Sequence, residues 1–384
     1  MSGPLRILTV IGARPQIIKA AAISRAIGTS FQGQIHETLL HTGQHYDANM
    51  SQVFFDELGI PRADIELGVG SGLHGAQTAR MIEGIEQRLR TGDFDAVLLY
   101  GDTNSTLAGA LAAAKLHVPV AHVEAGLRSF NKRMPEELNR IMCDHCSTWL
   151  FCPTDTAVEN LRREGFAIGT SGPPDMDTPL VCQSGDVMFD NSMHFAEVAE
   201  RSSRVLRDLG LAPGSFVLAT VHRDHNTDVP QRLNDLFEAL LDIHRRHGLA
   251  IVLPLHPRTR KMMDALLAPA LRAAISAAEG FKLVPPAGFL DMIALERHAR
   301  LVMTDSGGVQ KEAYFFGKPC VILRPATEWV ELVQAGQAVL ADADPARITA
   351  AADRFLAEGA PACPPLFGDG HAAERICTEL LKTR

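Results

Sequence analysis

The chain has 384 residues, of which 46% are hydrophobic, and a chain of this length predicts two domains rather than one core. Its formal net charge of −8 argues against nucleic acid or an anionic membrane as the main partner. The seven cysteines are an odd number spread along a large chain, so we expect a reducing compartment and no disulfide framework.

The first residues run directly into a predicted strand, without the charged and apolar regions of a secretory signal. No apolar run is long enough to span a bilayer, so we expect a cytoplasmic protein. Cys143, His145, Cys146 and Cys152 lie close together in a pattern that suggests zinc. No second pair of ligands stands at a zinc-like spacing, and we therefore predict no metal site.

Short apolar runs alternate with longer helical patterns along the whole chain. In the first half, the predicted strands cover residues 5–10, 96–100, 118–123 and 148–152. In the second half, they cover residues 216–220, 250–255, 281–284, 301–304 and 320–323. This alternation predicts an α/β protein with two Rossmann-like domains, whose parallel sheets carry helices on both faces and face each other across a cleft.

Residues 169–180 are rich in Gly and Pro, as is typical of a linker between domains. We therefore expect an N-terminal domain at residues 1–172 and a C-terminal domain at residues 173–366. The remaining segment, 367–384, contains a helical pattern at about residues 372–382 that can pack back on the N-terminal domain.

Polar side chains follow the predicted strands in both halves of the chain. The clusters cover residues 12–15, 101–105, 122–126, 222–223, 256–258 and 305–306. Ligands of open α/β sheets bind outside the carboxyl ends of the strands. We therefore expect these clusters to meet in one cleft between the domains.

Residues 301–312 describe a buried strand that runs into the open first turn of a helix. Ser306, Gly307 and Gly308 lack bulky side chains where the helix exposes unpaired N–H groups and the positive end of its dipole. A diphosphate can approach such a turn. Glu312 lies about one helical turn further on, where it could reach the hydroxyls of an attached ribose. An ordinary strand-to-helix turn is the structural alternative.

Cationic residues in the clusters suit an anionic diphosphate. They are Arg14, Lys19, Arg128, Arg140, His222, His256, Arg258 and Arg324.

Acidic residues at or just beyond the strand ends all lie in the first half: Asp102, Glu124 and Glu136. Each has a structural alternative, because Asp102 could cap the helix that begins near Ser105. Glu124 and Glu136 could instead pair with arginines four residues further along the chain. As a set opposite a diphosphate site, the three carboxylates indicate acid/base work on the group that the phosphate carries.

Longer motifs occur in one order, nearly from end to end of the chain. They cover residues 12–16 with Lys19, 41–45, 101–106, 122–128, 134–140, 222–223, 256–258, 304–308 with Glu312, and 327–328. In these motifs the sequence resembles the non-hydrolysing UDP-N-acetylglucosamine 2-epimerases. The resemblance implies a GT-B-like pair of Rossmann-type domains, a UDP-sugar substrate and a homodimer. It implies no cofactor, because nothing is oxidised.

The family's chemistry gives the three carboxylates a role. UDP leaves C1 while C2 loses its proton, and UDP then adds back to the 2-acetamidoglucal as a proton reaches the other face of C2. The resemblance places Asp102, Glu124 and Glu136 in the acid/base set and His222 near the leaving diphosphate. The implied substrate-binding residues, with Phe289 or Met292 as the apolar wall beside uracil, are Arg14, Lys19, Gln44, His45, Arg140, His256, Phe289, Met292, Ser306, Gly307, Gly308, Glu312 and Arg324.

The leading hypothesis is a C2 epimerase that interconverts UDP-N-acetylglucosamine and UDP-N-acetylmannosamine for a surface polysaccharide. A hydrolysing 2-epimerase that releases N-acetylmannosamine and UDP, or an epimerase for another UDP-2-acetamido sugar, stays open within the family. A GT-B glycosyltransferase and a non-catalytic nucleotide-sugar binding protein are the alternatives from other classes. The spacing of the carboxylates does not tell which of them serves which face of C2.

Overall fold

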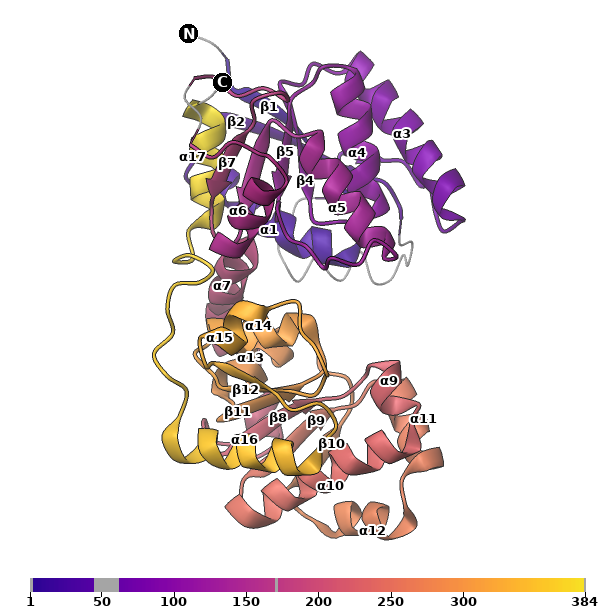
Figure 1. Ribbon diagram of the computed structural model, residues 1–384, viewed down its shortest axis with the longest axis vertical. Coiled ribbons are helices and arrows are strands. Elements are labelled where there is room, and N and C mark those ends of the chain that lie inside the picture. The colour runs from indigo at the N-terminus through magenta and orange to yellow at the C-terminus, as the bar shows by residue number, and fades with distance from the viewer. Residues whose placement is uncertain (1–2, 45–61, 170–171, 383–384) are drawn as a thin grey trace. The chain divides into compact units, whose positions relative to one another are not determined.

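The computed structural model of the protein describes residues 3–44, 62–169 and 172–382 (Figure 1). The chain divides into two units. Unit 1 comprises residues 1–191 together with 365–384, and unit 2 comprises residues 192–364. Each unit is built on its own parallel sheet with helices around it, which confirms the predicted pair of Rossmann-like α/β domains.

Unit 1 contains a seven-stranded parallel sheet with the order β3-β2-β1-β4-β5-β6-β7. Its strands are β1 (Leu5–Ile11), β2 (Ile35–His41), β3 (Ile65–Glu66), β4 (Ala96–Tyr100), β5 (Val120–Val123), β6 (Trp149–Cys152) and β7 (Leu180–Gln183). From β1 the chain adds β2 and β3 on one side of the sheet, and it then adds β4 to β7 on the other side. The carboxyl ends of β1 and β4 therefore flank a topological switch point, the usual ligand position of such a sheet.

Most helices of unit 1 connect successive strands of this sheet, and α17 (Ala372–Lys382) comes from the end of the chain. The connecting helices are α1 (Arg14–Thr29), α3 (His74–Thr91), α4 (Asn104–Lys115), α5 (Pro135–His145) and α6 (Asp155–Arg163). Helix α4 packs between α3 and α5, and α1 packs against α17, although these last two helices lie at opposite ends of the chain (Figure 1).

The central strands of unit 1 form because their apolar residues are covered on both faces. Every residue of β4, from Ala96 to Tyr100, is at most 1% exposed, and all residues of β5 and β6 are buried. Near-continuous apolar runs of this kind are typical of parallel strands between two helical layers. The buried strands fix the polar turns that follow their carboxyl ends.

The Gly- and Pro-rich segment 169–180 lies within unit 1. It precedes β7, and β7 pairs with β6 to complete the first sheet, so unit 1 extends beyond residue 172. The chain changes unit within α7 (Val187–Ser202). Asp190 on α7 accepts hydrogen bonds from the backbone N–H groups of Ala372 (3.1 Å) and Ala373 (2.7 Å), and it thereby caps the start of α17.

Unit 2 contains a six-stranded parallel sheet with the order β10-β9-β8-β11-β12-β13. Its strands are β8 (Phe216–Thr220), β9 (Ala250–Pro254), β10 (Phe281–Val284), β11 (Leu301–Thr304), β12 (Cys320–Ile322) and β13 (Ala338–Leu340). The order reverses between β8 and β11, so the second switch point lies at the carboxyl ends of these strands.

The helices of unit 2 surround this sheet. After α7 they are α8 (Val205–Asp208), α9 (Asp224–Thr227), α10 (Pro230–His247), α11 (Pro257–Leu266), α12 (Pro269–Ala277), α13 (Phe289–His298), α14 (Gly307–Phe315), α15 (Val330–Gln334) and α16 (Pro345–Glu358). Helices α10, α11, α12 and α16 begin with proline, which suits the first helical position because its missing N–H would have no partner there.

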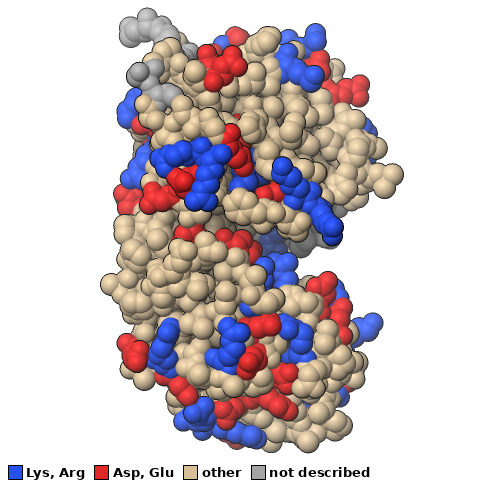
Figure 2. Space-filling model, in the orientation of Figure 1, with Lys and Arg blue, Asp and Glu red and all other residues tan. Residues whose placement is uncertain are grey.

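Among the described residues, no helix is both long enough and apolar enough to cross a bilayer. Lys and Arg are interspersed with Asp and Glu on the face that Figure 2 shows, over both units. The described part of this face therefore carries no continuous basic stripe of the kind that binds a nucleic acid backbone.

Candidate active site

The turn between β1 and α1 is tied to the end of β4. The side-chain oxygen of Gln16 accepts hydrogen bonds from the backbone N–H groups of Gly12 (2.9 Å) and Ala13 (3.2 Å). Its amide nitrogen donates to the carbonyl oxygen of Tyr100 (3.0 Å). The buried Gln16 side chain thus joins both sides of the first switch point, and the exposed Arg14 begins α1 beside it.

Lys19 and Glu124 form an ion pair at this switch point. Lys19 lies on α1 and Glu124 directly follows β5, and their side chains are 14% and 10% exposed. Glu124 has a φ of +73°, a left-handed conformation that costs energy in a residue with a side chain. Strained backbone of this kind is concentrated at functional sites. Glu124 thus pairs with Lys19, on an element far from it in the sequence.

Arg128 is not available for a diphosphate. Its side chain is 1% exposed and forms ion pairs of 2.7 Å with both Asp144 and Glu164. These partners raise the pKa of Arg128 even though burial lowers it. Arg128 is thus a buried part of unit 1, which corrects its place in the expected cationic set.

Asp102 follows β4 and forms an ion pair with Arg140 on α5. It does not cap the next helix, because α4 begins at Asn104 and Thr103 is the capping residue. The side chain of Asn139 donates to the backbone carbonyl of Asp102 (3.0 Å), so consecutive residues of α5 hold both its backbone and its side chain. Asp102 keeps 31% of its side chain exposed.

The carboxylate that α5 directs into this network is that of Glu137, and it was missed in the sequence. Glu137 accepts hydrogen bonds from the N–H groups of Ser129 and Phe130 (both 2.9 Å) and pairs with Arg140 (2.5 Å). Burial raises the pKa of Glu137, but these donors outweigh it and lower the pKa overall. Glu136 is exposed in the first turn of α5, so the expected pairing of Arg140 with Glu136 is replaced by pairs with Glu137 and Asp102.

The side chain of Gln44, which follows β2, contacts the first turn of α4. Its side-chain oxygen accepts hydrogen bonds from the backbone N–H (3.0 Å) and the hydroxyl (2.7 Å) of Ser105. This contact satisfies an N–H group of the first turn of α4. His45, the other residue expected here, lies outside the described residues.

His122 lies on β5, two residues before Glu124, and is fully buried. Its Nδ1 lies 2.6 Å from Asp144 Oδ1, and its Nε2 lies 2.7 Å from the carbonyl oxygen of Gly101. Burial lowers the pKa of His122, but the neighbouring Cys143 and Asp144 raise it, and the net result is a pKa well above the ordinary value.

Asp305 organises the second switch point, in unit 2. It directly follows β11, is fully buried, and accepts hydrogen bonds from the backbone N–H groups of His222 (3.0 Å) and Arg223 (3.0 Å) and from the Asn226 side chain (3.1 Å). Its other oxygen lies 3.0 Å from Nδ1 of His222. Burial raises the pKa of Asp305, but the His222 ring and these donors lower it overall. A buried carboxylate thus holds the His222 ring, whose side chain is 41% exposed.

Helix α14 begins directly after Asp305, with Ser306 as its N-terminal cap residue. The Ser306 side chain makes no capping hydrogen bond, so it leaves the first N–H groups of the helix open to a ligand. Trp329 Nε1 donates to the carbonyl of Gly307 (3.0 Å) and fixes the first turn. Arg324 pairs with Glu328 at 2.9 Å. The predicted strand-to-helix turn is therefore present.

A cavity of about 370 Å³ opens at this switch point. Its lining residues are Thr220, Val221, His222, Pro254, His256, Arg258, Pro286, Ala287, Met292, Ser306 and Val309. It combines polar groups near α14 with an apolar wall, as nucleotide sites do. Met292 lies on this wall, whereas Phe289 packs edge to face against Phe195 with 5.2 Å between ring centroids.

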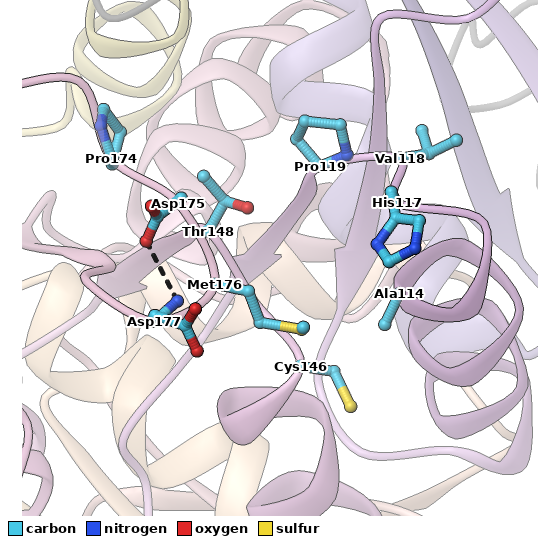
Figure 3. A pocket seen from close by; sticks show the side chains of 10 residues that line it. All are labelled: Ala114, His117, Val118, Pro119, Cys146, Thr148, Pro174, Asp175, Met176 and Asp177. Atoms are coloured by element: carbon cyan, nitrogen blue, oxygen red, sulfur yellow. Dashed lines mark hydrogen bonds between the residues drawn. The ribbon is translucent and has the colours of Figure 1, made fainter.

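Another cavity, of about 260 Å³, lies at the amino ends of strands β5 and β6 in unit 1 (Figure 3). It is lined by residues that precede β5 and β6, such as Pro119 and Thr148, and by residues 174–177. The Asp175 side chain accepts a hydrogen bond from the backbone of Asp177 (3.0 Å) beside it. None of the expected site residues lines this cavity, so it is separate from the first switch point.

The cysteines Cys143, Cys146 and Cys152 are free thiols. Within the described ranges, no group of three or more His, Cys, Asp or Glu residues is arranged to hold a metal ion.

Two doubly wound units, each with charged side chains at its switch point, define a GT-B-like α/β protein. Residues 30–381 match the family model described as UDP-N-acetylglucosamine 2-epimerase. The chain therefore belongs to this epimerase family, as the sequence motifs predicted.

Known members are similar over nearly their whole length. The UDP-2,3-diacetamido-2,3-dideoxy-D-glucuronate 2-epimerase of Pseudomonas aeruginosa is 48% identical over 98% of this chain and 100% of that protein. The UDP-N-acetylglucosamine 2-epimerase of Methanocaldococcus jannaschii is 37% identical over 97% of this chain and 98% of that protein. A crystal structure of the latter enzyme in complex with UDP-GlcNAc and UDP has a TM-score of 0.78 and 36% identity, and it covers 98% of this chain and 100% of that chain.

Proposed function

We propose that the protein epimerises C2 of a UDP-2-acetamido sugar, with unit 2 binding UDP and unit 1 supplying the proton-handling groups. The observation that carries this proposal is the division of charge between the two switch points. Asp102 and Glu124 lie at the first, each held by a cation, whereas the open start of α14 and the His222 ring lie at the second. The first suits proton transfer and the second suits a diphosphate.

The chemistry follows from the poor acidity of the C2 proton. In the forward step, the C1–O bond breaks with its electron pair going to UDP, while a carboxylate takes the proton from C2. The product is a 2-acetamidoglucal and bound UDP. In the return step, UDP attacks C1 and a carboxylic acid delivers a proton to the other face of C2. The two proton-transfer groups come from the set Asp102, Glu124 and Glu136.

The remaining site residues hold the substrate. Gly307 and Gly308 present N–H groups to the diphosphate and Ser306 presents its hydroxyl, because the Ser306 N–H already donates to Thr304 (2.9 Å). His222 stabilises the charge of the diphosphate as it leaves. Glu312 accepts hydrogen bonds from the ribose, and Met292 covers the uracil. Further contacts to the diphosphate or sugar come from Arg14, Lys19, Gln44, Arg140, His256 and Arg324.

Of the UDP-2-acetamido sugars, we infer that a 2,3-diacetamido-2,3-dideoxy-glucuronate is the preferred substrate. The Pseudomonas aeruginosa enzyme named for this sugar is 48% identical, whereas the Methanocaldococcus jannaschii enzyme named for UDP-N-acetylglucosamine is 37% identical. UDP-N-acetylglucosamine, the substrate expected from the sequence motifs, is the second candidate.

The direct test is incubation of purified protein with each UDP-sugar in deuterated water, followed by NMR. We expect a C2-inverted UDP-sugar that carries deuterium at C2, with a larger kcat/KM for the diacetamido-uronate. Absence of inversion and of deuterium for both sugars contradicts the proposed epimerase. Free sugar and UDP as the main products indicate the hydrolysing reaction instead.

We expect Gly308→Ala to weaken UDP binding while leaving the fold intact. Of the described residues outside its own turn, the Ser306 hydroxyl alone lies within 4 Å of the position of the added methyl group, at 3.9 Å. The methyl group therefore occupies space that the diphosphate needs. Loss of one hydrogen bond to a charged group, about 1.5–3 kcal/mol, raises Kd by about ten- to a hundred-fold.

Isothermal titration calorimetry with UDP measures this change. Gly28→Ala is the matched control, because Gly28 lies on α1 with no neighbour within 4 Å of the added methyl group. Equal Kd values for the two variants would show that the diphosphate does not bind at the start of α14.

A further inference from the structure

The His122 ring is the best-defined polar group of unit 1 that the proposed chemistry does not use. It is fully buried on β5, and each ring nitrogen has one partner at close hydrogen-bond distance. Nδ1 faces a carboxylate oxygen of Asp144 at 2.6 Å, and Nε2 faces the carbonyl oxygen of Gly101 at 2.7 Å. Carboxylate and carbonyl oxygens only accept hydrogen bonds, so both nitrogens donate and the ring is an imidazolium.

The carboxylate of Asp144 balances the positive charge of the His122 ring. Asp144 is fully buried and also accepts hydrogen bonds from Arg128 (2.7 Å) and from the backbone N–H of Gly126 (3.2 Å). Arg128 in turn pairs with Glu164. Buried ion networks of this kind add little net stability compared with apolar residues, so stability alone does not account for it.

In front of the ring lies the turn that carries Asp102. Gly101 has a φ of +60° and donates its N–H to the carbonyl of Val123 (3.0 Å). A Cβ on Gly101 would lie 3.2 Å from Lys19 Nζ and 3.4 Å from Glu124 Oε2. The glycine therefore packs directly against the ion pair of Lys19 and Glu124, and its carbonyl is oriented by the His122 ring.

We propose that His122 is a positioning residue: its Nε2–H clamps the Gly101 carbonyl and thereby fixes the turn that holds Asp102 next to Glu124. Its Nδ1–H contact with Asp144 orients the ring for this task. The inference rests on the proposed role of Asp102 and Glu124 in proton transfer. A turn without the clamp leaves the Asp102 carboxylate free to move relative to C2, and misplacement by about 1 Å can cost about a hundred-fold in rate.

The protonation of the ring is testable without any assay of activity. We expect NMR of the protein with ¹⁵N-labelled histidine to show one ring with a proton on both nitrogens at pH 8, and this ring signal to be absent in His122→Asn. Among the described residues, Cys143 and Asp144 are titratable groups that act on this ring, and Arg128 pairs with Asp144. A His122 ring with an unprotonated nitrogen at pH 8 would overturn the proposal.

Two substitutions separate positioning from a purely structural role. The amide nitrogen of asparagine takes the place of Nδ1, so His122→Asn keeps a donor toward Asp144 and loses the donor toward Gly101. The amide nitrogen of glutamine takes the place of Nε2, so His122→Gln keeps a donor toward Gly101 and loses the donor toward Asp144. We expect His122→Asn to lower kcat about ten-fold more than His122→Gln, with KM and the Kd of UDP similar in both.

Each result of this comparison decides the proposal. Equal kcat values for the two variants, corrected for the folded fraction, contradict it, and so does a loss that appears in KM. If the wild-type protein epimerises no UDP-sugar, the proposed function fails while the NMR result still decides the state of His122. If the wild-type protein is active and the variants do not differ, only the positioning role fails.

Discussion

Asp102→Asn should lower kcat for epimerisation by about 10²- to 10⁴-fold, which is the range for loss of a positioned acid or base. Asparagine keeps the shape of the side chain and can still accept a hydrogen bond from Arg140, the ion-pair partner of Asp102. It can neither take a proton from C2 nor deliver one. Because UDP is proposed to bind in unit 2, the Kd of UDP should stay within a factor of about two, a difference of about 0.4 kcal/mol.

The measurement combines NMR detection of the C2-inverted product with calorimetric binding of UDP. Asp208→Asn is a suitable control, because this aspartate also pairs with an arginine but is 63% exposed on α8. Turnover of Asp102→Asn at the level of the control would remove Asp102 from the acid/base set. Loss of UDP binding together with turnover would indicate a role in binding.

The sequence predicted β1, β4–β6 and β8–β12, and of the described strands it missed β2, β3, β7 and β13. Strands β1, β4 and β11 consist of apolar runs and were expected at nearly their observed bounds. Strand β2 contains His36 and Glu37 among its apolar residues and does not read as a buried run. Strand β7 follows the Gly- and Pro-rich segment that was interpreted as a linker. It was missed because its pairing with β6 is a contact between residues that are distant in the sequence.

The positions of the site residues were predicted better than their partners. The strand-end rule placed Asp102 and Glu124 after strands of the first half and His222 and Ser306 after strands of the second half, and within its own unit each pair follows the carboxyl ends of the strands. Ion pairs depend on which elements pack together, and sequence spacing shows this only along one helix. The pair of Glu124 with Lys19 on α1 could not be predicted, because the two residues lie far apart in the sequence.

The same limit explains the exchange of Glu136 for Glu137 in the network around Arg140. Both glutamates stand in the first turn of α5, and a motif cannot tell which of two neighbours faces the sheet. The loop before α5 decides this, because the N–H groups of Ser129 and Phe130 bind the Glu137 carboxylate. Catalytic roles inferred from the motif thus need the structure to assign contacts residue by residue.

Glu296→Gln should raise the melting temperature at pH 8 and change it little at pH 5. Glu296 lies on α13, is fully buried, and has no hydrogen-bond donor at either oxygen within the described part of the chain. Its neighbour is the Glu312 side chain on α14. Burial, and then the charge of the neighbouring Glu312, raise the pKa of Glu296 well above its ordinary value.

The sign of the effect follows from linkage. Below the ordinary pKa, Glu296 is protonated in both the folded and the unfolded chain, and its full contribution to stability is present. As the pH rises, the unfolded chain loses this proton first, while folded Glu296 keeps it. The free energy of unfolding then falls by about 1.4 kcal/mol per pH unit until the pH passes the folded pKa.

A glutamine at this position stays neutral at every pH, so the variant escapes this loss. Each kcal/mol corresponds to about 2–4 °C in a domain of this size, and the difference at pH 8 should therefore be several degrees. Calorimetric melting of wild type and variant between pH 5 and 8 measures it, with Glu358→Gln, an exposed position on α16, as the control for charge. A melting-temperature difference that does not depend on pH would show that Glu296 is ionised in the folded protein.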